Sequence, residues 1–169
     1  DFVLVTFHPE TVEGNKNNYF ANEMKIALEE ILNSINVVIT MPNADTLATE
    51  YRKKLEELKL ENPNQVLLIE NFGKENYFSA MYYAKILIGN TSSGILEAAS
   101  FNKYVINVGD RQKGRKQSKN VLNSKFTAMD IILKFNEAFK LGDFKGDNLY
   151  YREGTAEGII NIIKKYDKL

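Results

Sequence analysis

Short apolar runs alternate along this chain with longer stretches in which apolar residues recur every three or four positions. The first run, FVLVT, covers residues 2–6 and is typical of a strand. The stretch 19–35 that follows has the spacing of one helix face, carried by Phe20, Met24, Ala27, Leu28 and Ile31. The chain therefore opens with a strand and then an amphipathic helix.

The alternation continues to the end of the chain. It predicts further strands over 36–40, 65–70, 86–90 and 104–109, with a short one near 120–122. It predicts helices over 45–60, 74–85, 94–101, 128–140 and 155–169. Strands that are continuously apolar are covered on both faces, so we expect an α/β fold with a doubly wound, mostly parallel sheet. Ligands of such sheets bind at the carboxyl ends of the strands.

Composition narrows the classes of function. The 169 residues include 22 basic and 22 acidic side chains, one histidine and no cysteine. This excludes a disulfide scaffold and a thiolate or histidine-rich metal centre, and we expect no metal and no cofactor. Zero net charge gives no attraction to nucleic acid, and no apolar run is long enough to span a membrane. We expect one cytoplasmic domain over residues 1–169, cut at a domain boundary because Asp1 directly precedes a strand.

The strongest local motif is NTSSG, residues 90–94, between a predicted strand and a predicted helix. Free N–H groups at a helix start bind anions, and small hydroxyl side chains let a phosphate approach. Glu97 then falls in the first helical turn, where it would accept hydrogen bonds from sugar hydroxyls. Ordinary helix capping by Ser and Thr explains the same residues and stays open. The common nucleotide fingerprints G-x-x-x-x-G-K-[ST] and G-x-G-x-x-G are absent.

Three other predicted strands are followed by polar residues. His8 follows the first strand, Asn43 the second, and Arg111 opens a basic loop after the fifth. Each has a plain structural alternative: a polar residue at a strand end, a turn beside a proline, and a solvated basic loop. Because the fold gathers these three loops and the 90–94 loop along one edge of the sheet, we expect all four to lie at one cleft.

The segments TFHPET, MPNAD, IGNTSSGILEAASF and GDRQKGR stand in the order and spacing of the UDP-N-acetylglucosamine 2-epimerases, and most of the chain resembles that family. The loop 90–94 and the RQKGR stretch resemble its hydrolysing branch. The resemblance implies two Rossmann-like domains in the glycosyltransferase type B (GT-B) arrangement. This chain is then the UDP-binding C-terminal domain, without the N-terminal catalytic half and inactive by itself.

The same resemblance implies release of UDP and a 2-epimerised acetamido sugar, for synthesis of sialic-acid-like sugars, by a protein that forms a homodimer when complete. The carboxylates that handle the C2 proton lie in the absent domain. Glu10 and Glu13, on the His8 loop, are expected to be solvated. The implied catalytic residue is His8, and the implied UDP-binding residues are Asn43, Thr91, Ser92, Ser93, Gly94, Glu97 and Arg111.

Other functions compete with this one. The nucleotide-sugar half of a GT-B glycosyltransferase would share the same fold, although the RQKGR stretch disfavours it. A non-hydrolysing 2-epimerase usually carries an Asp-Ser-Gly-Gly type loop where this chain has residues 90–94. A serine hydrolase would need G-x-S-x-G, and neither Ser92 nor Ser93 has glycine two residues before it. The domain alone also fits a non-catalytic nucleotide-binding module.

Overall fold

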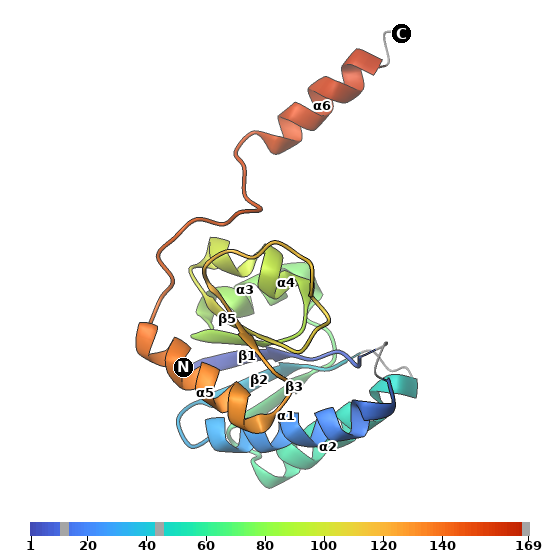
Figure 1. The fold of residues 1–169 in the computed structure, drawn as a ribbon, viewed down its shortest axis with the longest axis vertical. Coiled ribbons are helices and arrows are strands. Elements are labelled where there is room, and N and C mark those ends of the chain that lie inside the picture. The colour runs from blue at the N-terminus through green and yellow to red at the C-terminus, as the bar shows by residue number, and fades with distance from the viewer. Residues whose placement is uncertain (11–13, 43–45, 167–169) are drawn as a thin grey trace.

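A single parallel sheet organises the molecule (Figure 1). The computed structural model describes residues 1–10, 14–42 and 46–166. Six parallel strands in this part of the chain stand in the order β3-β2-β1-β4-β5-β6. Their bounds are β1 Phe2–Thr6, β2 Asn36–Thr40, β3 Val66–Ile69, β4 Ile86–Gly89, β5 Tyr104–Val108 and β6 Val121–Ser124. The order reverses between β1 and β4, so the loops after these two strands part and leave a crevice.

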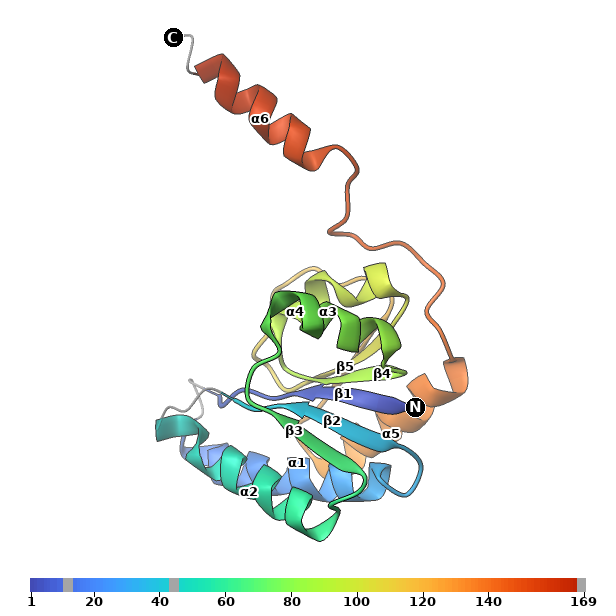
Figure 2. The same ribbon diagram turned by 180° about the vertical axis from the view of Figure 1, so that it is seen from behind.

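Helices cover both faces of the sheet, as the continuously apolar strands require (Figures 1 and 2). One face carries α1 (Asn17–Ile31), α2 (Thr49–Glu61) and α5 (Ala128–Leu141). The other carries α3 (Gly73–Tyr83), α4 (Ser92–Leu96) and the 3₁₀ turn η3 (Ala98–Phe101). Two further 3₁₀ turns, η1 (Gly14–Lys16) and η2 (Thr46–Ala48), lead into α1 and α2. The predicted doubly wound α/β fold is confirmed.

The core lies on both sides of β1, the first strand of the chain. Val3 and Val5 join the larger cluster beneath α1, α2 and α5, whereas Leu4 joins the smaller cluster beneath α3. The predicted apolar face of α1 is buried at all five positions: Phe20, Met24, Ala27, Leu28 and Ile31. Burial on both faces fixes the end of β1, from which the His8 loop leaves.

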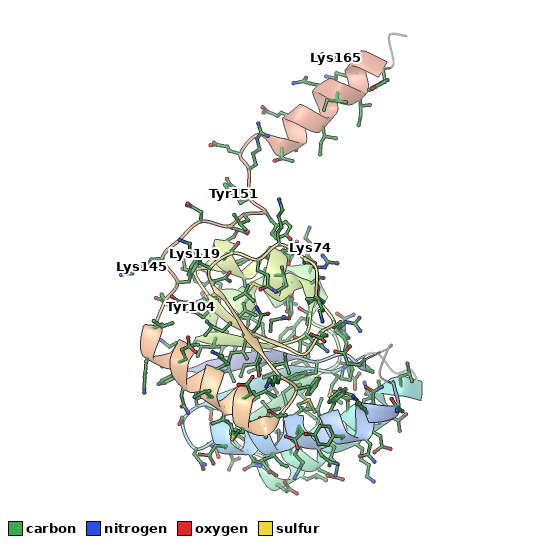
Figure 3. The ribbon with its side chains drawn as sticks, viewed as in Figure 1. Lys74, Tyr104, Lys119, Lys145, Tyr151 and Lys165 are labelled. Atoms are coloured by element: carbon green, nitrogen blue, oxygen red, sulfur yellow. The ribbon has the colours of Figure 1, made fainter. Side chains whose placement is uncertain are left out.

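The last helix, α6 (Thr155–Tyr166), stands away from the sheet and its covering helices (Figure 1). An extended segment leads to it, and Figure 3 shows Tyr151 on this segment and Lys165 near the far end of the helix. None of the α6 residues is buried. No helix in the described part of the chain combines the length and the apolar character needed to cross a membrane.

Candidate functional site

A cleft of about 1740 Å³ opens at the carboxyl edge of the sheet. The loops after β1, β4 and β5 form its walls together with the starts of α1 and α5. Four residues expected to bind ligand meet there, namely His8, Thr91, Ser92 and Arg111. The fold therefore gathers polar side chains from three separate loops around the point where the strand order reverses.

Asn90, fully buried at the end of β4, holds the His8 loop in place. Its Oδ1 accepts the His8 N–H at 2.7 Å, and its Nδ2 donates to the His8 carbonyl at 2.8 Å. Its carbonyl in turn accepts Nε2 of buried Gln112 at 2.9 Å. One asparagine thus links the loops after β1, β4 and β5. This role of Asn90 was not predicted, because nothing in the local sequence indicates a hydrogen bond to a residue 82 positions away.

Arg111 also reaches the β1 loop. Its Nη1 donates to the Pro9 carbonyl at 2.9 Å, directly beside His8. A guanidinium carries five N–H donors, so this single contact orients the group while other donors face the cleft. The predicted position of Arg111 beside the other site residues is what the structure shows.

The start of α4 shows the ordinary helix capping that the sequence left open as the alternative to phosphate binding. Thr91 Oγ1 accepts the Gly94 N–H at 3.3 Å, so Thr91 caps the helix in the ordinary way. Ser93 Oγ lies 2.8 Å from the Thr91 hydroxyl and 2.7 Å from the Tyr77 hydroxyl of α3. Thr91 and Ser92 line the cleft, whereas Ser93 is engaged on the side of α3.

Gly94 has a packing role that the phosphate-loop hypothesis does not require. It is buried, and a Cβ built there would lie 2.9 Å from Cγ1 of Val105 on β5. Real Cβ atoms do not approach so closely, so the glycine lets the first turn of α4 lie against the sheet.

The prediction that Glu97 lies in the first turn of the helix was wrong. Because Thr91 caps the helix, α4 begins at Ser92 and ends at Leu96, and Glu97 follows its last residue instead of lying in its first turn. Its Oε2 is buried and has no hydrogen-bond partner among the described residues. Burial raises the pKa of the Glu97 carboxyl. A ligand hydroxyl that donates to this oxygen would relieve the penalty of burial.

Several lining residues were not predicted. Asn107 Nδ2 donates to Asn123 Oδ1 at 2.9 Å, and Asn123 Nδ2 donates to Gln117 Oε1 at 2.8 Å, which gives the β5–β6 side an amide wall. Their positions at or after strand ends were the only signal. Asn43 lies outside the described residues. Across 1–10, 14–42 and 46–166, no group of three or more His, Cys, Asp or Glu side chains is placed to hold a metal ion.

Comparisons with known proteins agree on one family. The sequence model described as UDP-N-acetylglucosamine 2-epimerase matches residues 1–164. The chain is 33% identical over 132 residues, 77% of its length, to the GDP/UDP-N,N'-diacetylbacillosamine 2-epimerase (hydrolyzing) of Campylobacter jejuni. It is 28% identical over 166 residues, 95% of its length, to the UDP-N,N'-diacetylbacillosamine 2-epimerase (hydrolyzing) of Legionella pneumophila. It spans only 34% and 42% of these two relatives.

Solved structures show the same fold. The UDP-GlcNAc 2-epimerase of Neisseria meningitidis bound to UDP-GlcNAc superposes with a TM-score of 0.74 at 16% identity. The match covers 98% of this chain and 45% of that one. At this identity the likeness concerns the arrangement of the backbone.

Proposed function

Because this chain belongs to the UDP-N-acetylglucosamine 2-epimerase family, we propose that it is the UDP-binding C-terminal domain of such an enzyme, with its substrate in the cleft described above. The observation that carries the proposal is the meeting of His8, Thr91, Ser92 and Arg111 at the switch point of the sheet. Rossmann-like domains bind nucleotides at this point.

Each group suits one part of a UDP-sugar. Arg111, with Thr91 and Ser92, neutralises and hydrogen-bonds the diphosphate. Glu97 is not among the residues that line the cleft, and its buried carboxylate would accept from the ribose hydroxyls beyond the start of α4. His8, the only histidine in the sequence, transfers a proton at the diphosphate or at the sugar.

The reaction we propose begins with departure of UDP from C1 as the C2 proton is removed, which forms a C1–C2 double bond. Water then adds across this bond, with hydroxide to C1 and a proton to the opposite face of C2, and gives the free 2-epimerised acetamido sugar. The names of the two bacterial relatives support this hydrolysing outcome. The carboxylates for the C2 proton belong to the domain that this chain does not contain.

Calorimetry with the chain tests the nucleotide assignment. We expect UDP to bind more tightly than inorganic phosphate, because the site contacts ribose as well as phosphate, and more tightly than ADP, because the family to which the chain belongs is named for a UDP-sugar. Equal affinities for UDP and ADP would contradict the assignment to this family's nucleotide. Binding of phosphate alone, with no gain from the nucleoside, would leave only an anion site.

Replacing Glu97 by Ala is expected to weaken UDP binding by about 1 to 3 kcal/mol, the range for loss of a hydrogen bond to a charged group. The free energy of unfolding should change little, because Glu97 Oε2 has no protein partner among the described residues to lose. Calorimetry measures the first effect and urea unfolding the second. Glu75→Ala, an exposed carboxylate in the first turn of α3, is the control and should leave UDP affinity unchanged. Loss of stability without loss of affinity would assign Glu97 a purely structural role.

A further inference from the structure

Glu10 was expected to be a solvated loop residue, yet its carboxylate lies among three loops of the cleft. Its Oε1 accepts Nδ2 of Asn90 at 3.3 Å. The same oxygen lies 3.4 Å from the point that a Cβ on Gly109 would occupy, and Gly109 has a φ of +73°. The carboxylate therefore lies where the loops after β1, β4 and β5 approach one another, two residues from His8.

The backbone of Glu10 is fixed as well. Its N–H donates to Oδ1 of Asn17 at 2.9 Å, and its carbonyl accepts Nδ2 of Asn17 at 3.1 Å. Asn17 is buried at the first position of α1. Since both backbone polar groups are held by a buried side chain, the carboxylate projects from a fixed backbone position.

The charge of Glu10 is opposite to what a diphosphate site requires. The groups assigned to the diphosphate are a guanidinium and hydroxyls, whereas a carboxylate in the same cleft repels phosphate oxygens. A carboxylate does accept several hydrogen bonds, so the bond from Asn90 fixes the group without excluding a ligand donor. The diphosphate carries no such donor; hydroxyl and N–H donors are carried by the uracil, by the ribose, which is assigned to Glu97, and by the sugar attached to UDP.

We propose that Glu10 is a sugar-binding residue, which accepts a hydrogen bond from a hydroxyl or amide N–H of the sugar attached to UDP. The assignment rests on the proposed function. It places the sugar in the part of the cleft that Glu10 lines, beside His8.

The test compares Kd for UDP with Kd for UDP-N-acetylglucosamine, measured with the whole chain by NMR titration. Glu10→Gln keeps an oxygen for the Asn90 amide but removes the charge. We expect the ratio Kd(UDP)/Kd(UDP-N-acetylglucosamine) to fall about tenfold, while UDP itself binds at least as well as before. The thermal unfolding midpoint is measured in parallel. If Glu10→Gln does not fold, Glu10→Asp, which withdraws the oxygens by one methylene, is judged by the same ratio.

UDP carries more negative charge than the UDP-sugar, so removing any carboxylate from the cleft favours UDP slightly. Asp110→Asn measures this effect, because Asp110 lines the same cleft with an 83% exposed side chain paired only loosely, at 3.5 Å, with Lys113. A fall in the ratio confined to Glu10 supports direct contact with the sugar. An unchanged ratio, or an equal fall in both variants, would overturn the assignment. Absence of UDP binding by the unaltered chain would refute the proposed function, and this assignment with it.

Discussion

Replacing His8 by Ala is expected to lower turnover about 100-fold or more in a protein that contains this chain together with its catalytic half, the usual scale for a positioned proton-transfer group. The fold should survive, because Asn90 holds the backbone N–H and carbonyl of His8 rather than its imidazole. The measurement is the rate of UDP release from UDP-N-acetylglucosamine, with the unfolding midpoint recorded for the same samples.

Lys113→Ala is the matched control for His8→Ala. Lys113 is a cation of the same cleft with a 77% exposed side chain, and we expect its removal to change turnover less than about threefold, as for other exposed charges. The chain alone, expected to release no UDP, serves as the blank. A lowered unfolding midpoint with unchanged turnover would make His8 a structural residue at a strand end.

Replacing Gly89 by Ala is expected to reduce the free energy of unfolding by about 3 to 5 kcal/mol, a large part of the 5 to 15 kcal/mol that typically stabilises a domain. Gly89 pairs with Thr6 where β4 meets β1, and a Cβ at this position would overlap the Thr6 carbonyl. Its φ of +152° is also rarely adopted by residues with a side chain. Backbone cannot move aside as a side-chain end does, so the sheet must shift.

Urea unfolding monitored by circular dichroism measures the effect. Gly158→Ala is the control, because nothing lies within 4 Å of the added carbon and Gly158 belongs to the fully exposed helix α6. We expect that change to leave the cooperative unfolding of the sheet domain unaltered. A Gly89→Ala variant as stable as the unaltered chain would mean that β1 and β4 separate more easily than their register indicates.

Much of the fold could be read from the sequence, because its signals are local. The continuous apolar runs predicted the buried parallel strands, and the three- and four-residue spacing predicted the buried face of α1. The first residue of α4 could not be predicted, because Thr91, Ser92 and Ser93 can all cap a helix. In the structure Thr91 is the cap, and Gly94 lies against Val105 of β5. Because Thr91 is the cap, Glu97 follows the last residue of α4 instead of lying in its first turn.

The site could be predicted only to the extent that it follows from the fold. His8, Ser92 and Arg111 were placed in one cleft because each follows a strand of a parallel sheet. The contacts of Asn90 with His8 and Glu10 were missed, because they join residues 80 or more positions apart. Such partners are set by the three-dimensional approach of loops, and no spacing in the sequence encodes them.

The central position of β1 also determines when the cleft can form. Among the strands of this sheet β1 is synthesised first, but it pairs with β4 as well as β2, and the β1–β4 pairing joins Thr6 to Gly89. Closing so long a loop is entropically unfavourable until the packing of both strands compensates for it. On a ribosome, β1, β2 and β3 can emerge and associate while the other edge of β1 is still unpaired. The cleft is therefore a late product of folding, and slow docking of β4 would leave an exposed strand edge in the nascent chain.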